Sequence, residues 1–291
     1  MKGLNIIVLA KQVPDTRNVG KDAMKANGTV NRAALPAIFN PEDLLALEQA
    51  LRLKDRHEGS QVTVVTMGPV RAANILRDAL FRGADKGVLI TDKKFAGSDT
   101  LATSYVLSRA LQKLAPFDII LCGRQAIDGD TAQVGPQVAE KLKIPQITYV
   151  EEILAVSKQK ITARRRMGNG METLQGKLPL LLTVHGAAPA CRTRNARRLM
   201  KYKHACTPSE MSHQREDYIR MHEHRHYLDL TEWNVNDLQA EEAYLGLYGS
   251  PTKVNAVTNI VFTARESKVL APTDEAINAL MAELVEHHTV G

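Results

Sequence analysis

The stretch GRQAIDGDTAQVGP, residues 123–136, carries most of the information about the fold of this chain. It follows the apolar run 117–122, which predicts a buried parallel strand, and it leads into residues 131–143, which predict a helix. In open α/β sheets, ligands bind outside the carboxyl ends of strands, where helix N-termini offer unpaired N–H groups to anions. Gly123, Gly129 and Gly135 allow close backbone approach there. The stretch therefore predicts a cradle for nucleotide phosphates; the alternative is an ordinary loop in which Asp128 and Asp130 cap the helix.

Apolar runs alternate with helical patterns on both sides of this stretch. Asn40 is expected to cap the first helix, with Pro41 at its first position and Asp43 three residues after the cap. The alternation indicates βαβ units and an α/β fold with a mainly parallel, doubly wound (Rossmann-like) sheet. The expected strands are 4–10, 61–66, 87–91 and 117–122, and the expected helices are 41–57, 70–82, 99–114 and 131–143.

The second half of the chain is expected to add a β-hairpin and an extended arm. Residues 147–150 continue the sheet, and 159–166 and 172–184 predict two strands joined through Gly168-Asn169-Gly170. This is not a dinucleotide fingerprint, because Thr173 occupies the third glycine position and strands lie on both sides. Beyond Thr183 a polar, charged segment runs to about Leu230, and a last amphipathic helix spans 273–287. We expect a nucleotide-binding α/β domain at 1–184 and a carboxyl-terminal arm plus helix at 185–291.

Composition fits one main core with an appendage. Hydrophobic residues make up 44% of the 291 residues, and no apolar run approaches the roughly 20 residues that span a bilayer. The amino-terminal strand lacks a small-residue cleavage site, so we expect a cytoplasmic protein. Cys122, Cys191 and Cys206 form neither a CxxC pair nor an even disulfide set, which suits a reducing compartment.

The net charge of +6 is concentrated between residues 164 and 203. Such a cluster can track nucleic-acid phosphates, but aromatic residues are only 4% of the chain and Tyr202 is the one aromatic residue within the cluster. We therefore expect no nucleic acid and interpret the segment as a basic arm that docks an acidic protein partner. The alternative is a solvated helix face. The cluster consists of Arg192, Arg194, Arg197, Arg198, Lys201 and Lys203.

Patterns for metal or nucleophilic chemistry are weak. His222 and His226 have the spacing of one helix face, but without an HExxH pattern a solvated polar face is favoured over a metal site. There is no GxSxG elbow, and Cys122 has the context of a small buried hydrophobe. Asp128 and Asp130 fit phosphate-loop or ribose contacts better than a general acid/base pair.

Residues 123–136 are similar to the nucleotide-binding signature of the beta subunit of electron-transfer flavoproteins. Residues 3–150 resemble that family continuously. One stretch departs from it, since the family's Asn-Glu-Pro-Arg is replaced by residues 187–192, which leave Arg192 as a shifted candidate for its Arg. Further landmarks in family order are Lys11-Gln12-Val13-Pro14-Asp15-Thr16, Asn40-Pro41 with Ala46-Leu47-Glu48, Thr66-Met67-Gly68-Pro69, Ala96-Gly97-Ser98-Asp99-Thr100-Leu101-Ala102-Thr103 and Gly249-Ser250-Pro251-Thr252-Lys253-Val254.

The resemblance implies an electron-transfer role, an arm that wraps an alpha subunit, and a nucleotide in this subunit. Some members hold AMP there, and electron-bifurcating members hold a second FAD. Residues 128–136, with Gly129 and the small Ala132, look like the bifurcating form. This implies FAD that takes a hydride from NADH, sends one electron to ferredoxin or flavodoxin, and sends the other through the alpha-subunit FAD to an acyl-CoA-dehydrogenase-type or other dehydrogenase. The alternatives are a non-bifurcating carrier with structural AMP and, in another class, a non-redox adenine-nucleotide-sensing module.

The resemblance also implies which residues contact the cofactor. Backbone N–H groups and Thr131 are expected to hold phosphate oxygens, Gln133 to add a donor, and Asp128 to accept from a ribose hydroxyl. Leu9 and Met67 are expected to flank a ring, with plain core packing as the alternative. No catalytic side chain and no metal ligand are expected. The full set is Leu9, Ala10, Asn40, Pro41, Glu42, Asp43, Met67, Gly123, Arg124, Gln125, Ala126, Ile127, Asp128, Gly129, Asp130, Thr131, Ala132, Gln133 and Val134.

Overall fold

A computed structural model describes residues 3–15, 35–157, 159–168, 170–212, 222–223, 225–253, 269–287 and 289–290. Within these residues, nine strands form one sheet in the order β11-β5-β4-β1-β6-β10-β7-β8-β9. All pairs from β11 to β7 are parallel, and β7, β8 and β9 pair antiparallel. The expected α/β class with a mainly parallel sheet and a β-hairpin is thereby confirmed. The strands are β1 (Asn5–Leu9), β4 (Gln61–Met67), β5 (Lys86–Ile90), β6 (Ile119–Gly123), β7 (Gln146–Val156), β8 (Lys160–Met167), β9 (Gly170–Lys177), β10 (Leu180–Val184) and β11 (Thr231–Trp233).

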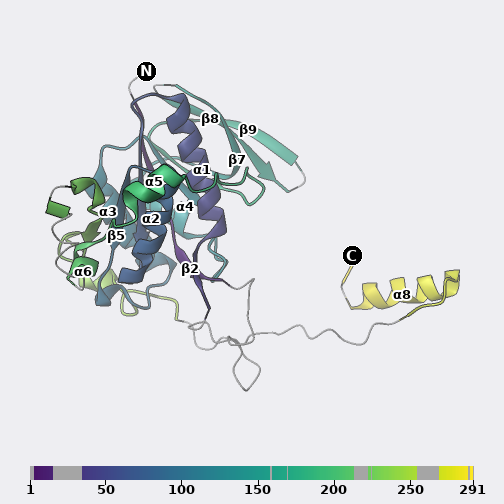
Figure 1. The fold of residues 1–291 in the computed structure, drawn as a ribbon. Coiled ribbons are helices and arrows are strands. Elements are labelled where there is room, and N and C mark those ends of the chain that lie inside the picture. The colour runs from purple at the N-terminus through teal and green to yellow at the C-terminus, as the bar shows by residue number, and fades with distance from the viewer. Residues whose placement is uncertain are drawn as a thin grey trace.

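Helices cover both faces of the sheet (Figure 1). Alternate residues of β1 point to opposite faces, because side chains of a strand alternate. Ile6 and Val8 pack in the core beneath α1 (Pro41–Arg56), α2 (Ala73–Arg82) and α5 (Ala196–Tyr202), whereas Ile7 and Leu9 pack in the core beneath α3 (Thr100–Leu114) and α4 (Val134–Leu142). The sheet is therefore doubly wound, and each face has its own apolar core.

The strand order places a topological switch point between β1 and β6. From β1 the chain moves outward through β4 to β5, then returns through α3 to β6 on the other side of β1. The carboxyl ends of β1 and β6 thus leave the sheet side by side while their connections diverge. In doubly wound sheets this is where ligands bind.

Several elements differ from the sequence predictions. The expected strand 172–184 is two strands that break around Pro179, and β10 enters the parallel sheet between β6 and β7 instead of extending the hairpin. The expected helix 131–143 begins only at Val134, because Asp130 and Ala132 adopt left-handed φ of 49° and 52°. The expected helix 70–82 opens with a 3-10 turn, η3 (Val70–Ala72). A small antiparallel ribbon of β2 (Gln12–Pro14) and β3 (Ala37–Phe39) was not expected.

The described residues between 185 and 250 pack on the α/β body more than the fading apolar pattern suggested. Tyr202, Leu230 and Leu245 are buried in its cores, and β11 extends the sheet beside β5. The α8 helix (Asp274–Glu286) stands apart from the other described elements (Figure 1), and none of its residues is buried. Short elements complete this part: η4 (Lys93–Phe95), α6 (Pro208–Met211), η5 (His226–Leu228) and η6 (Glu242–Tyr244).

In the part of the chain that the structure describes, no helix is both long and apolar enough to cross a bilayer. Three residues of the quoted motifs, Thr16, Asn169 and Val254, lie outside the described residues.

Candidate functional site: the loop at the sheet switch point

The structure brings most of the predicted site residues together at the switch point. Leu9 ends β1 and Ala10 follows it, Met67 ends the adjacent β4, and Gly123 ends β6. Residues 40–43 at the start of α1 lie against the loop 123–133, which we call the nucleotide loop. Direct hydrogen bonds connect these segments, although they are far apart in the sequence.

Asp43 joins the ends of β1 and β6. Its carboxylate accepts a hydrogen bond from the Lys11 backbone N–H at 2.8 Å and one from the Gly123 N–H at 2.8 Å. Burial raises the pKa of Asp43 from its ordinary value of 3.8 to about 7, against these two N–H groups and Asn40, which lower it. An acid at the third position of α1 therefore fixes the spacing of the two strand ends.

Asn40 and Glu42 hold the first half of the nucleotide loop. The Asn40 amide donates to the Gln125 carbonyl at 2.9 Å and accepts from the Ile127 N–H at 3.2 Å. Glu42 accepts from the Arg124 guanidinium at 2.9 Å and from the Gln125 N–H at 3.1 Å. The expected side-chain cap by Asn40 is wrong, since its amide is engaged by the loop and makes no cap bond to α1.

The second half of the loop turns sharply before α4. The N–H groups of Gly129 and Asp130 both donate to the Ala126 carbonyl, and Gln125 donates to the Asp130 carboxylate at 2.7 Å. Neither Asp128 nor Asp130 caps α4, so the capping role that the ordinary-loop alternative gave them is wrong. The cap residue of α4 is Gln133, which makes no side-chain cap bond and instead accepts from the Thr100 hydroxyl at 2.9 Å. The N–H groups of Val134 and Gly135 at the start of α4 therefore have no capping side chain, whereas Pro136 has no N–H and the Gln137 N–H donates to the Gln133 carbonyl.

The three glycines of this stretch differ in why the structure needs a residue without a side chain. A Cβ at Gly123 would lie 2.6 Å from the Asp43 carboxylate, and a Cβ at Gly135 would lie 2.9 Å from the Cys122 sulfur. Gly129, in contrast, faces open space, because apart from its two chain neighbours no described residue has an atom within 4 Å of the place that a Cβ would take. The close approach at Gly123 and Gly135 is therefore structural, whereas Gly129 leaves room beside the loop.

Lys11 is a site residue that the sequence prediction omitted. Its ammonium group contacts both Asp128 carboxylate oxygens, at 2.8 and 2.7 Å, and half of its side chain remains exposed. If Asp128 accepts a hydrogen bond from a ribose hydroxyl, as expected, the same carboxylate must also pair with Lys11. The sequence signal that could have found Lys11 is its position two residues after the end of β1, at the switch point.

Leu9 and Met67 differ in what they offer to a ligand. Leu9 is only 5% exposed and packs in the core beneath α3 and α4, as in the core-packing alternative. Met67 is half-buried at the same edge and packs against that core from its rim. Ala10 is buried, and Pro41 begins α1.

The remaining candidate clusters lie away from this loop. His222 is buried and its imidazole contacts Asp229 at 2.8 Å, in contrast to the solvated face expected for it, whereas His226 is exposed. Among the described residues no group of three or more His, Cys, Asp or Glu is placed to hold a metal ion. Cys122 is buried, as expected, and burial raises the pKa of its thiol.

The residues at the switch point fit the phosphates of a nucleotide. An uncapped helix N-terminus carries partial positive charge and free N–H donors, which is the arrangement that binds phosphate. The left-handed residues Asp130 and Ala132 end the loop, and α4 begins two residues after Ala132 at Val134. The Thr131 and Gln133 side chains are exposed beside that turn and carry hydroxyl and amide groups able to donate.

Comparison with known proteins agrees with this geometry. The electron transfer flavoprotein domain matches residues 27–203. The electron transfer flavoprotein subunit beta of Clostridium acetobutylicum is 40% identical over 99% of this chain and 100% of its own length. The caffeyl-CoA reductase-Etf complex subunit CarD of Acetobacterium woodii is 37% identical over 99% and 100%. The acryloyl-CoA reductase electron transfer subunit gamma of Anaerotignum propionicum is 51% identical over 62% of this chain and 67% of its own. This chain therefore belongs to the electron transfer flavoprotein family, as one of its beta subunits.

Proposed function

We propose that this chain binds FAD at the nucleotide loop and acts, with an alpha subunit, in electron bifurcation. The observation that carries the proposal is the uncapped N-terminus of α4 behind the left-handed turn at Asp130 and Ala132. Bound FAD would supply the acceptor for a hydride from NADH and the route for its two electrons, one to ferredoxin or flavodoxin and one to a dehydrogenase through the alpha-subunit FAD.

The chain's own residues bind and orient the nucleotide in this proposal. The α4 N–H groups, the Thr131 hydroxyl and the Gln133 amide hold phosphate oxygens, while Asp128, fixed by Lys11, accepts from a ribose hydroxyl. Asn40, Glu42 and Asp43 keep the loop in place through the bonds described above. No side chain of the site is assigned a proton-transfer role.

The choice of FAD over AMP rests on the open space at Gly129. A larger ligand than AMP needs room beyond the phosphates, and no described atom occupies that side of Gly129. The relatives named for caffeyl-CoA and acryloyl-CoA reductase systems support an acyl-CoA-dehydrogenase-type partner. AMP without bifurcation is the second candidate, and it is favoured only if the space beside Gly129 is filled by the alpha subunit.

The test uses the purified alpha–beta complex. Nucleotides are extracted and separated, and the absorbance spectrum is followed during rapid mixing with NADH. Two flavins per heterodimer with bleaching by NADH support the proposal. One flavin plus AMP, without NADH-dependent bleaching, would establish the simple carrier, and absence of flavin would favour a nucleotide-sensing module.

A double substitution tests the loop itself. Asp130→Ala with Thr131→Val should weaken FAD binding to the stripped complex, because it removes the Thr131 hydroxyl donor and the Gln125–Asp130 hydrogen bond that holds the loop, each contributing about 1 to 3 kcal/mol. Both residues are exposed, so the unfolding temperature should change little. The control, Glu58→Ala with Thr173→Val, changes the same kinds of side chain at exposed positions away from the loop. Equal affinity in both variants would place the phosphates elsewhere.

We further propose that residues 185–291 dock the alpha subunit in the cytoplasm. The α8 helix carries exposed apolar side chains, with Ile277, Met281 and Val285 each about half exposed. Co-expression with the alpha subunit should yield a flavin-loaded heterodimer on size exclusion. A stable, flavin-loaded monomer from the beta chain alone would contradict the need for that partner.

A further inference from the structure

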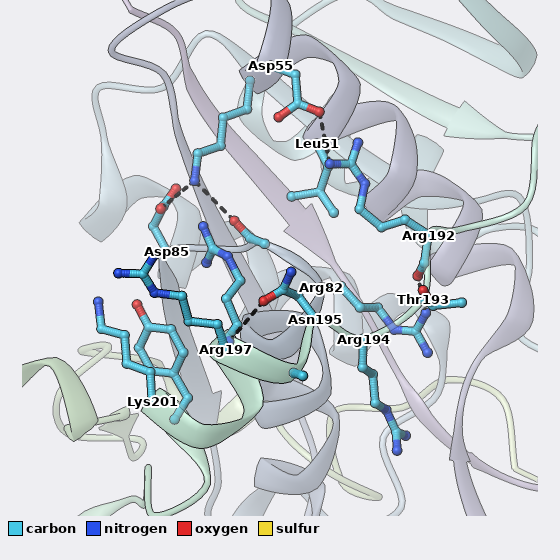
Figure 2. A pocket seen from close by; sticks show the side chains of 15 residues that line it. Leu51, Asp55, Arg82, Asp85, Arg192, Thr193, Arg194, Asn195, Arg197 and Lys201 are labelled. Carbon is cyan, nitrogen blue, oxygen red and sulfur yellow. Dashed lines mark hydrogen bonds and ion pairs between the residues drawn. The ribbon is translucent and has the colours of Figure 1, made fainter.

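A second concave site lies at the opposite edge of the sheet from the nucleotide loop. It is a cavity of about 790 Å³ between the carboxyl-terminal ends of α1 and α2 and the segment 192–202 (Figure 2). Asp43 and Asp55 are twelve residues apart on α1, which separates the two sites by roughly 18 Å at 1.5 Å per residue. We call this cavity the α5 pocket.

Positive charge dominates the α5 pocket. Seven cationic side chains line it, against the carboxylates of Asp55 and Asp85. Figure 2 shows Arg197 and Lys201 on one side and Arg192 and Arg194 on the other. The volume lies within the range of roughly 300 to 1,000 Å³ that is usual for small-molecule sites.

Two of the four arginines that were expected to dock a protein partner, Arg192 and Arg194, already form ion pairs within the chain. Arg192 forms ion pairs with Glu48 at 2.9 Å and with Asp55 at 2.8 Å. Arg194 pairs with Asp78 at 2.6 Å, and Lys54 pairs with Asp85. These groups are largely neutralised, so they shape the pocket without supplying its excess charge.

Three cations of α5 remain uncompensated among the described residues. Arg197 and Arg198 form no ion pair there, and the Arg198 guanidinium donates a hydrogen bond to the Ala84 carbonyl at 3.3 Å. The Lys201 ammonium lies 4.8 Å from the centre of the Tyr202 ring and 4.9 Å from that of Tyr227, with no carboxylate partner. Arg197 and Lys201 are four residues apart on one helix, a spacing at which like charges destabilise the helix.

We propose that the α5 pocket binds a small ligand with two or more linked phosphate groups. Two guanidinium groups and an ammonium group match several phosphate oxygens at once, and guanidinium suits phosphate geometry particularly well. A single phosphate carries too little charge to neutralise three cations. The concavity favours a small polyanion over the flat surface of an acidic protein. A ligand bound in the α5 pocket would bridge α5 and the carboxyl-terminal ends of α1 and α2. The proposal does not depend on which nucleotide occupies the switch point.

The test uses the purified alpha–beta complex with its own nucleotides retained, so that the nucleotide loop is filled. Inorganic tripolyphosphate is titrated calorimetrically into the wild type and into Arg197→Gln/Arg198→Gln/Lys201→Gln. The triple variant should bind about tenfold or more weakly, because it loses charge-assisted hydrogen bonds. A control with the same change in net charge, Lys93→Gln/Lys160→Gln/Lys177→Gln, replaces exposed lysines outside the pocket and should lose about threefold or less.

Each outcome decides the proposal. Selective loss in the α5 variant supports it, with saturable binding by the wild type and unchanged flavin or AMP content in both variants. No heat of binding to wild type overturns it. Equal losses in the two variants would show non-specific attraction to net charge. Weaker docking of a dehydrogenase by the α5 variant, without any tripolyphosphate binding, would overturn it in favour of an acidic protein partner.

Discussion

Replacing Asp43 by Asn should remove a pH dependence of stability that the native chain carries. The carboxyl group is buried between the Lys11 and Gly123 N–H groups, and burial raises its pKa to about 7. The folded state therefore binds a proton more tightly than the unfolded state, in which the pKa is near 3.8. The stability from this protonation is complete below the unfolded pKa and is lost as the pH rises through about 7.

The size of the effect follows from these two values. Between about pH 5.5 and about pH 8 the native chain should lose on the order of 2 kcal/mol of unfolding free energy from this group alone. Asn does not titrate, so the variant should lack this loss. It should be less stable than the native chain at the lower pH by about 1 to 3 kcal/mol, since the Asn NH₂ group faces one of the two N–H donors.

Denaturant unfolding followed by the fluorescence of Trp233, the single tryptophan, measures both quantities. Trp233 lies on β11 beside β5, so its signal reports on the sheet. The other titrating groups are common to both chains, and the difference between the two pH profiles isolates Asp43. Parallel profiles, within about 0.5 kcal/mol at every pH, would refute the reasoning.

Three further substitutions have definite expected outcomes in thermal or denaturant unfolding. Gly123→Ala should lower the free energy of unfolding by about 3 kcal/mol, because the new Cβ would lie 2.6 Å from the Asp43 carboxylate. Gly129→Ala should change it by less than about 0.5 kcal/mol. Similar losses in the two variants would contradict the close approach at Gly123. Glu48→Gln should lower the free energy of unfolding by about 3 kcal/mol, because it weakens the ion pair with Arg192, and it should speed proteolysis of residues 193–201. Unchanged proteolysis would show that the Glu48–Arg192 ion pair does not hold this segment in place. Leu121→Ala, at a fully buried position of β6, should cost about 2 to 5 kcal/mol, and a smaller loss would indicate that the core collapses around it.

The alternating half of the sequence predicted its own structure well because its signals are local. The apolar runs 61–66 and 117–122, for example, form β4 and β6, and the strand boundaries agree with the prediction to within a few residues. The position of the site followed from the same pattern, since Gly123 ends a buried strand and a helix comes soon after. Parallel sheets place such ends on one edge, which is a property of topology and not of any single residue.

The errors arose where long-range contacts decide the local structure. Asn40 has the chemistry of a helix cap, but the loop 85 residues later supplies better partners for its amide. Residues 180–184 are all buried, and nothing within them indicates whether they extend a hairpin or fill a gap in a parallel sheet. Lys11 was not predicted because its partner, Asp128, is 117 residues away. The α5 helix lies in a polar segment that is attached to the body by ion pairs with α1 and α2 and by the buried Tyr202.

The position of β10 constrains the order in which this protein assembles during synthesis. β6 and β7 are separated in the sheet by a strand that the ribosome makes only after the β7–β8–β9 ribbon. Until residues 180–184 emerge, β6 has one open edge, and the Arg124 N–H lacks the Val184 carbonyl that receives it in the finished protein. Gly135 likewise packs against Thr183 of the late strand. A nascent chain that ends before residue 184 therefore exposes an unpaired hydrophobic strand edge, a template for aggregation, and its nucleotide loop lacks the support of β10.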